Sequence, residues 1–599
     1  MSSADLDYAL ERAQEKVKLR QDYRILFRLF HYILNYRAKL SVAFVLIMVI
    51  GYLGAIAPKI SALAIDRGIG EKNYDTLKSM AFLYLLVVAG TGIISYFQQL
   101  LITRVGQKIM QDLTMDLFRH CQRLSLSFYN KTPVGVLVTR LTNDIQSLQE
   151  MFTSGLVATL SDVVLLFYVL FNMFKMDVQL TVVAALALPL VFLSTSFFRR
   201  AIRKTYDQIR VRIAKVNAFL NEHITGMRVV QLQNAEGESA EEFSILSVDL
   251  CDAWLKTVTY MALYFPFVSL VGGIMTAAVL WYGGGQVVKE RFTYGNLVAF
   301  IQYVGMLMMP IRRLSDKYNI FLSAVASAQK VFGVMDNREI IPEPENPVPL
   351  HELQNSVEFR NVTFGYNPSE PVLKNVSFRI AKNERIAIVG ATGAGKTTII
   401  NLLYRYYDVD AGEILIDGRR IKDFSTRELR RHFGLVQQEV FLFSGTILDN
   451  IRLGDESISP EQVRAAARLV KADKFIEKLP EAYNAKLGER GTGLSTGEKQ
   501  LLAFARTVAM NPKIMLVLDE ATSNIDSHTE RLIQEGLEHL LRDRTALIIA
   551  HRLSTIRAAD RIIVMHKGEV REIGTHPELI RKRGLYYSLY RLQFDMMPG

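Results

Sequence analysis

The sequence predicts two classes of structure in one chain: an all-α membrane domain of six spans, followed by an α/β domain. The first observation is that 50% of its 599 residues are hydrophobic, with the long apolar runs gathered before residue 330. That length also calls for several domains. The second observation is a glycine-rich stretch, Gly390–Thr398, between a strand-like run and a helix start. Together these observations predict a membrane half and a strand-and-helix half.

Basic residues gather beside the apolar runs, and the formal net charge of the chain is +11. Arg199, Arg200, Arg203 and Lys204 follow one run, and the segment 18–28 precedes the first. This placement is typical of the cytoplasmic loops of membrane proteins. Because no aromatic-basic platform is evident in the second half, we favour membrane topology and expect no nucleic-acid partner.

Six segments are long and apolar enough to cross a bilayer. They are residues 40–62, 79–102, 155–175, 178–198, 258–282 and 294–316. Short polar turns join three pairs of them, whereas the connections 103–154 and 199–257 are long, charged and helical in pattern. We therefore predict a multi-pass protein of the cytoplasmic (inner) membrane with both termini, both long connections and the second domain in the cytoplasm. Residues 1–39 then form a cytoplasmic N-terminus with an interfacial helix, and residues 40–335 form the membrane domain.

Charged residues are sparse inside these segments, where Lys59 and Asp162 stand nearly alone until the cytoplasmic end of the sixth, which carries Arg312, Arg313, Asp316 and Lys317. This pattern argues against a proton relay or a charged ion filter, and it favours apolar or amphipathic cargo. The last segment carries adaptable side chains that suit either ligand contacts or helix packing, of which we favour packing: Tyr303, Met306, Met308 and Met309. The prolines that predict kinks are Pro189, Pro266 and Pro310.

A phosphate-binding loop is predicted in the second domain, which covers residues 356–599 after a proline-rich acidic linker at 336–355. The pattern G-x-x-x-x-G-K-[ST] opens a helix directly after a buried strand, which is the context such a loop needs. Its glycines let backbone N–H groups surround an anion. Lys396 can reach the β- and γ-phosphates of a nucleotide, and the Thr397 hydroxyl can bind Mg²⁺. The alternative is a glycine-rich turn without a ligand.

Further polar residues follow predicted strands of the same domain. Gln438 comes just after one apolar run, and His551 follows another. Asp519 and Glu520 end a third run. A carboxylate at the end of a core strand can hold the shell of a Mg²⁺ ion, and the next one can accept a proton from water. Between these runs, Leu494–Glu498 precedes a helical segment.

In this order, the motifs resemble those of ATP-binding cassette (ABC) transporters, and the chain from about residue 22 onward resembles an exporter half-transporter of the multidrug or lipid type. The resemblance implies a six-helix membrane domain of the exporter type I fold, fused to an α/β P-loop NTPase cassette. It implies ATP hydrolysis coupled to export of hydrophobic or amphipathic drugs, lipids or peptides, with ATP and Mg²⁺ as ligands and a second half-transporter as partner. An ATP-gated channel or a regulatory ABC protein on the same fold is the alternative.

The resemblance also implies roles for single residues. Tyr366 is expected to stack on adenine, Glu520 to act as the catalytic base, and His551 to contact the γ-phosphate. The rest of the expected ATP-binding set is Gly390, Ala391, Thr392, Gly393, Ala394, Gly395, Lys396, Thr397, Thr398 and Gln438. The expected Mg²⁺ ligands are Thr397, Gln438 and, through water, Asp519. Ser523 and Asp526 resemble the D-loop that crosses between two cassettes.

Three further segments correspond to contacts between the two halves of such an exporter. Gly488–Gly491 resembles the segment that touches the partner's coupling loops. Met115–Arg119 and Asn217–Gly226 lie where the coupling helices of the membrane domain are expected.

The signature segment, which closes on the partner's ATP in this family, corresponds to Leu494, Ser495, Thr496, Gly497 and Glu498. It departs from the usual Leu-Ser-Gly-Gly-Gln at two positions. Thr496 adds a side chain where backbone approaches a phosphate, and Glu498 brings a carboxylate near a polyanion. Because the phosphate loop, Glu520 and His551 look complete, we expect the change to affect the partner's site. We favour a heterodimer, and a homodimer with a tolerated variant signature remains open.

Overall fold

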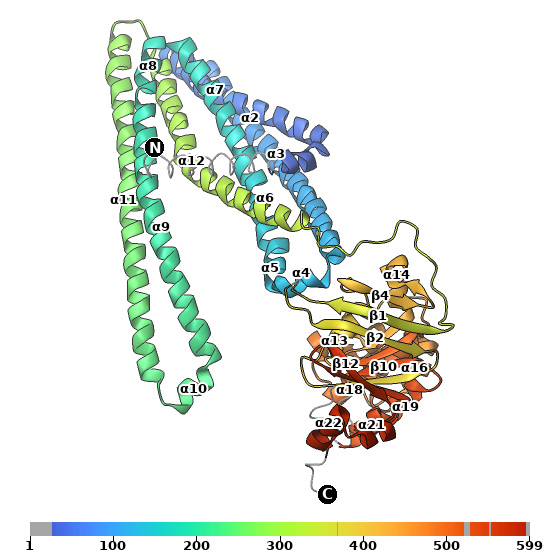
Figure 1. Ribbon diagram of the computed structural model, residues 1–599. Helices are drawn as coiled ribbons and strands as arrows, with labels where there is room; N and C mark the ends of the chain where they lie inside the picture. Colours follow the sequence, from blue (N-terminus) through green and yellow to red (C-terminus); the bar gives the residue numbers. More distant parts are fainter. Residues whose placement is uncertain (1–24, 26, 368, 520–526, 550–552, 595–599) are drawn as a thin grey trace, which may run out of the picture. The chain divides into compact units, whose positions relative to one another are not determined.

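The computed structural model describes residue 25 and residues 27–367, 369–519, 527–549 and 553–594 of the chain (Figure 1). These residues form two compact units. The first is the helical membrane unit, which runs to Gln122 and continues from Val134 to Asn337. The second is the cassette unit, which joins Arg123–Pro133 to the chain from Arg338 onward.

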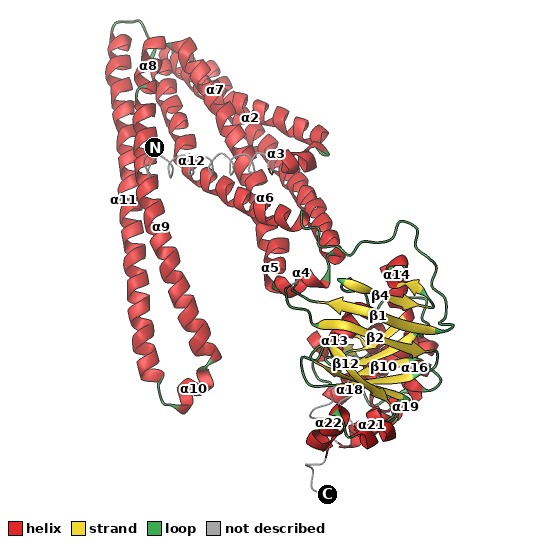
Figure 2. Cartoon of the chain, in the orientation of Figure 1, coloured by secondary structure: helices red, strands yellow, loops and turns green. Residues whose placement is uncertain are grey.

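The membrane unit is entirely helical (Figure 2). Its elements are α2 (Arg37–Leu63), η1 (Ala64–Gly70), α3 (Tyr74–Arg123), α5 (Val134–Thr139), η2 (Arg140–Asp144), α6 (Ile145–Glu150), η3 (Met151–Val157), α7 (Ala158–Met176), α8 (Val178–Ala185), α9 (Ala187–Thr225), α10 (Met227–Leu232), α11 (Glu236–Val288) and α12 (Tyr294–Met335). Among the described residues, five continuous helices are long and apolar enough to span a membrane: Arg37–Gly70, Tyr74–Arg123, Val134–Met176, Val178–Thr225 and Glu236–Val288. The sixth predicted span falls within α12.

The predicted prolines behave in two ways. Pro189 lies in the first turn of α9, and the helical hydrogen-bond pattern has a break at Leu186, between α8 and α9, although Leu186 keeps helical backbone angles. The break follows from the pyrrolidine ring, which clashes with the carbonyl four residues earlier. By contrast, Pro266 and Pro310 lie inside the uninterrupted helices α11 and α12.

Packing of the membrane unit accounts for two of the adaptable side chains in the last span. Tyr303 is fully buried, and its hydroxyl donates to the Ala55 carbonyl at 2.6 Å. Met308 lies in the same apolar cluster, whereas Met309 is 52% exposed. The sequence suggested that Asp162 stands nearly alone. In the structure it forms an ion pair with Lys317 of α12. The sequence could not reveal this pair, whose members are 155 residues apart.

The cassette unit contains two main sheets. The smaller sheet has the order β2-β1-β4-β5, from β1 (Ser356–Phe364), β2 (Leu373–Ala381), β4 (Ala411–Ile416) and β5 (Arg419–Arg420). The larger has the order β12-β11-β3-β10-β9-β6, from β3 (Arg385–Val389), β6 (Phe433–Val436), β9 (Met515–Asp519), β10 (Ala546–Ile549), β11 (Arg561–His566) and β12 (Glu569–Gly574). A short pair, β7 (Gly445–Thr446) and β8 (Lys486–Leu487), completes the strands.

Helices surround these sheets in the cassette unit. They are α4 (Leu126–Lys131), α13 (Lys396–Leu403), η4 (Ile421–Asp423), α14 (Thr426–His432), α15 (Ile447–Arg452), α16 (Pro460–Leu469), α17 (Asp473–Ile476), η5 (Ala482–Asn484), η6 (Glu489–Gly491), α18 (Thr496–Met510), α19 (Ser527–Leu541), α20 (Leu553–Arg557), α21 (His576–Lys582) and α22 (Leu585–Phe594).

Strand direction in the larger sheet positions the predicted site. Five of its strands run parallel, and only β12 is antiparallel to its neighbour. Their carboxyl ends therefore meet at one edge of the sheet, where ligands of open α/β sheets bind. Gly390 follows β3 at that edge, Gln438 lies two residues beyond β6, and Asp519 ends β9.

The coupling-helix predictions need correction. Met115–Arg119 is not a separate element, because α3 continues unbroken to Arg123. The short helix that follows it is α4. In the other connection, Asn217–Gly226 covers the end of α9, and the short helix is α10, directly after Gly226.

Candidate nucleotide-binding site

The predicted phosphate loop joins the buried strand β3 to α13, as the sequence indicated. Gly395, the residue before α13, has a φ of 98°, a conformation that side chains disfavour. Gly390 is required for a different reason, since a Cβ there would lie 2.4 Å from the Met565 carbonyl oxygen. No described side chain caps the start of α13. Its first N–H groups are therefore left for an anion.

Lys396 is the first residue of α13 and is only 8% exposed. Its ammonium donates to the carbonyls of Gly390 at 2.7 Å and Ala391 at 3.1 Å. Burial lowers the pKa of Lys396, and the nearby Asp519 charge acts in the opposite direction. The lysine is therefore a desolvated cation held within the loop, which is the arrangement that phosphate recognition needs.

Asp519 lies level with the strand that leads into the loop. It pairs with Ile549 of β10, and Ile549 pairs with Ile388 of β3. Two strand spacings therefore separate the backbones of Asp519 and Ile388, or about 10 Å. The sheet register thus brings a carboxylate and the phosphate loop to the same edge. Gln438 is exposed just beyond β6.

Four predicted functional residues lie outside the described residues: Glu520, Ser523, Asp526 and His551. Their proposed roles remain predictions. The described part of the site is the loop, Lys396, Asp519, Gln438 and Tyr366.

Tyr366 lies beside the phosphate loop, with 46% of its surface exposed. Its hydroxyl donates to Thr398 Oγ1 at 3.3 Å and accepts from Asn401 Nδ2 at 2.9 Å. Its ring packs edge-to-face on Tyr407, with centroids 5.1 Å apart. An exposed aromatic side chain anchored to α13 offers a surface for a nucleotide base. The sequence pointed to Tyr366 but not to Tyr407, for which the only signal was a cluster of three tyrosines at 404–407.

Unlike the phosphate loop, the signature segment precedes a helix whose N-terminus is capped by side chains. Ser495 caps α18, and its hydroxyl accepts from the Glu498 N–H at 3.3 Å. The Glu498 carboxylate in turn accepts from the Ser495 N–H at 2.8 Å. This reciprocal capping box uses donors that would otherwise face an anion. Lys499 donates to the Arg490 carbonyl at 2.9 Å, which ties the helix to the Gly488–Gly491 segment.

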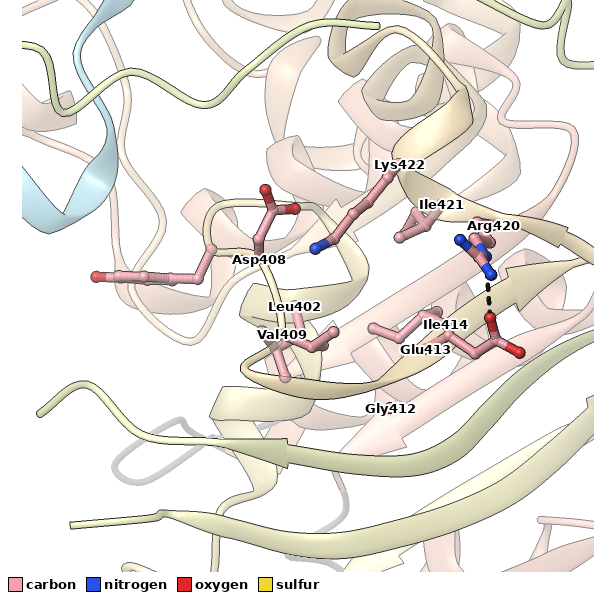
Figure 3. A pocket seen from close by; sticks show the side chains of 10 residues that line it. Leu402, Asp408, Val409, Gly412, Glu413, Ile414, Arg420, Ile421 and Lys422 are labelled. Carbon is pink, nitrogen blue, oxygen red and sulfur yellow. Dashed lines mark hydrogen bonds and ion pairs between the residues drawn. The ribbon is translucent and has the colours of Figure 1, made fainter. Parts of the chain in front are cut away.

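A separate cavity of about 220 Å³ lies on the cassette between α13 and the smaller sheet (Figure 3). Its apolar wall includes Leu402, Val409 and Ile414, and an ion pair between Arg420 and Glu413 at 3.1 Å lies at one side. None of the predicted ATP-binding residues lines it.

Comparison with known proteins matches both halves of the chain. The family model described as the ABC transporter transmembrane region matches residues 40–311, and the ABC transporter model matches residues 373–523. The chain belongs to the ABC transporters. An ATP-dependent lipid A-core flippase of Syntrophus aciditrophicus is 38% identical to this ABC transporter over 93% of the chain and 92% of the flippase. A probable multidrug resistance ABC transporter ATP-binding/permease protein of Bacillus subtilis is 36% identical over 83% of the chain and 74% of that protein.

A solved structure agrees with these matches. A bacterial Atm1-family ABC exporter with ATP bound superposes with a TM-score of 0.77 at 28% identity, covering 94% of this ABC transporter and 99% of that chain. The transporter is therefore a half-transporter of the exporter type, and it couples ATP hydrolysis to export. The fold implies a multi-pass membrane protein, a transported substrate and dimerisation of cassettes.

Proposed function

We propose that this exporter moves hydrophobic or amphipathic substrates, such as drugs, lipids or small peptides, out across the cytoplasmic membrane. The sparse charge of the membrane unit supports this proposal. Asp162, an acidic residue inside a predicted span, forms an ion pair with Lys317, so a purely ionic cargo would find little to bind there. A lipid flippase and a multidrug transporter among the relatives are consistent with such cargo.

Mg²⁺ would be held by the Thr397 hydroxyl, the Gln438 side chain and, through water, Asp519. These are oxygen donors of the kind Mg²⁺ prefers, and they lie at the same edge of the sheet as the loop. When bound, the ion would neutralise charge on the phosphate oxygens. Lys396 would bind the β- and γ-phosphates, Tyr366 would stack on the base, and His551 would contact the γ-phosphate.

Hydrolysis would use Glu520 as the base that accepts a proton from the attacking water. Two cassettes would close over nucleotide, because each site takes the signature segment of the other chain. Closure would draw the cytoplasmic connections together and favour the outward-open membrane domain. Nucleotide can drive this change only by binding the closed state more tightly than the open one.

The Glu520→Gln variant tests this mechanism. Loss of the general base should lower ATP hydrolysis by about 100- to 10,000-fold and leave the ATP-bound closed state populated. Phosphate release and trapping of labelled ATP on the purified transporter measure the two effects. Turnover at the wild-type rate would falsify the assignment of Glu520.

We further propose that the working unit is a heterodimer. The altered signature, with Thr496 exposed and Glu498 engaged in its own helix cap, would act on the partner's nucleotide and slow that site. Expression of this chain alone, followed by the mass of the purified complex and a transport assay, tests the proposal. A stable homodimer that transports would contradict it.

Transport and ATPase assays can identify the substrate and distinguish an exporter from an ATP-gated channel. An exporter should accumulate substrate in ATP-fed inverted vesicles, and its ATPase should respond to some members of a compound panel. An ATP-gated channel would instead conduct ions across a planar bilayer without uphill transport.

A further inference from the structure

A short piece of the membrane-domain sequence belongs structurally to the cassette unit. Residues Arg123–Pro133, which contain α4, lie in the long connection between α3 and α7 but cluster with the cassette. The Ser125 N–H donates to the Glu339 carbonyl at 2.7 Å, and Lys131 forms an ion pair with the Glu339 carboxylate at 3.3 Å. Both ends of α4 are thus attached near the start of the cassette chain.

Asn130 makes a second side-chain contact between α4 and the rest of the cassette unit. Its amide donates to the Tyr407 hydroxyl at 2.8 Å. Burial raises the pKa of Tyr407, with a further contribution from Tyr366, so the phenol is protonated at neutral pH. The hydroxyl can therefore serve as a stable hydrogen-bond partner for α4.

Tyr407 in turn contacts Tyr366 through an aromatic triad, defined as Phe364, Tyr366 and Tyr407. The Tyr366 ring meets the other two edge-to-face, each at 5.1 Å and 84°. The third pair, Phe364 and Tyr407, lies at 5.5 Å and 56°. Phe364 is 4% exposed and anchors the triad to β1. Because each ring touches both others, a shift of Tyr407 must be accommodated by Tyr366.

Tyr366 completes a continuous path from α4 to the phosphate loop. Its hydroxyl is bonded to Thr398 and Asn401 of α13, and Thr398 is 4% exposed within the loop motif. The contacts Asn130–Tyr407, Tyr407–Tyr366 and Tyr366–Thr398 therefore link a cytoplasmic connection of the membrane domain to the nucleotide site.

We propose that Tyr407 is a positioning residue whose hydrogen bond to Asn130 sets the orientation of Tyr366 and so couples α4 to nucleotide binding. This proposal rests on the proposed role of Tyr366 as the platform for the base. Stacking of a base on Tyr366 fixes its ring, and the triad transmits that restraint to Tyr407 and α4. Binding linkage is reciprocal. If ATP binding changes the affinity for transported substrate through α4, then substrate binding changes the affinity for ATP by the same factor.

The test compares two Tyr→Phe changes three residues apart. Tyr407→Phe removes the hydroxyl bonded to Asn130 and keeps the ring. Tyr404→Phe is the matched control, because the buried Tyr404 hydroxyl has no hydrogen-bond partner within the described chain. The assembled transporter is reconstituted in lipid nanodiscs, and kcat and KM for ATP are measured with and without a stimulating compound from the panel.

We expect Tyr407→Phe to raise KM for ATP and reduce substrate stimulation by about two- to tenfold, the range that one neutral hydrogen bond supports. Basal kcat should stay within about twofold, because the groups that act on the phosphates are unchanged. Asn130→Ala should have the same effect, and the double variant should be no worse than either single variant. Tyr404→Phe should match the wild type in all these values.

Two results would overturn the coupling. One is that Tyr407→Phe matches Tyr404→Phe, and the other is that the Asn130→Ala and Tyr407→Phe effects multiply. Tyr366→Ala separates this failure from failure of the base platform itself. If Tyr366→Ala raises KM for ATP but Tyr407→Phe does not, only the coupling fails. If Tyr366→Ala leaves KM unchanged, the platform fails and the coupling fails with it.

Discussion

Two helix N-termini of the cassette show how one type of structure can be left open or closed to an anion. At α13 the preceding residue is Gly395, and no described side chain caps the helix. At α18 the preceding residue is Ser495, and a Ser495–Glu498 capping box covers the first turn. Both ends carry the partial positive charge of aligned peptide dipoles. The phosphate loop leaves that charge available, whereas the signature segment neutralises it with its own carboxylate.

Lysine is also used differently at the two ends. Lys396 is buried, and its ammonium donates to two carbonyls of the loop. A bound phosphate would accept from the same ammonium. Lys499 donates to the Arg490 carbonyl and thereby holds the signature helix against its neighbouring segment. The two glycine-containing segments are therefore not equivalent binding surfaces, although both precede helices of the same domain.

Among changes at these two helix ends, replacement of Lys396 by alanine should have the largest effect. It removes a desolvated cation from the loop, and ATP hydrolysis should fall by about 100- to 1,000-fold, as when one preorganised charge-stabilising donor is lost. Steady-state phosphate release by the assembled transporter measures this effect.

Lys499→Ala is the matched change at the other helix. Loss of the Lys499 ammonium should disturb only the attachment to Arg490. Because this hydrogen bond is exposed to solvent, hydrolysis should fall by less than about tenfold, the upper end of the range for an ordinary hydrogen bond. Equal losses for the two variants would mean that the N-termini of α13 and α18 are functionally equivalent, despite their different capping.

The close approach at Gly390 gives the second prediction. In Gly390→Ala the added methyl would meet the Met565 carbonyl, so the loop must shift, at a cost of about 1–3 kcal/mol. We expect a lower thermal unfolding midpoint and weaker ATP binding, measured by differential scanning fluorimetry with and without ATP.

Gly393→Ala provides the control for backbone strain alone. Gly393 has a φ of 80°, but a Cβ there would meet nothing within 4 Å. This variant should therefore be milder than Gly390→Ala in both measurements. The reverse order would show that crowding against Met565 does not hold the loop in place.

Local patterns explain which parts could be predicted from the sequence. The strand, glycine-rich turn and helix around Lys396 are contiguous, and the end of α9 is marked by Gly226, a typical helix terminator. No such residue interrupts 115–119, which is why α3 continues beyond the predicted coupling segment. Contacts between distant residues carry no local signal. Asn130 and Tyr407 are 277 positions apart, and neither residue alone indicates the other.

The signature carboxylate gives the smallest expected effect. Charges at helix ends contribute about 0.3–1 kcal/mol, so Glu498→Gln should strengthen ATP binding at the site that this signature completes by no more than about fivefold. The measurement is nucleotide retained per assembled transporter across an ATP titration.

Glu578→Gln is the control, because it makes the same change in another capping box. There the Glu578 carboxylate accepts from the Thr575 N–H at 2.9 Å at the start of α21. It should weaken that cap without altering nucleotide retention. If both variants raise retention equally, or if Glu498→Gln lowers it, the carboxylate does not close the signature helix to phosphate, and the difference between α13 and α18 has no consequence for nucleotide binding.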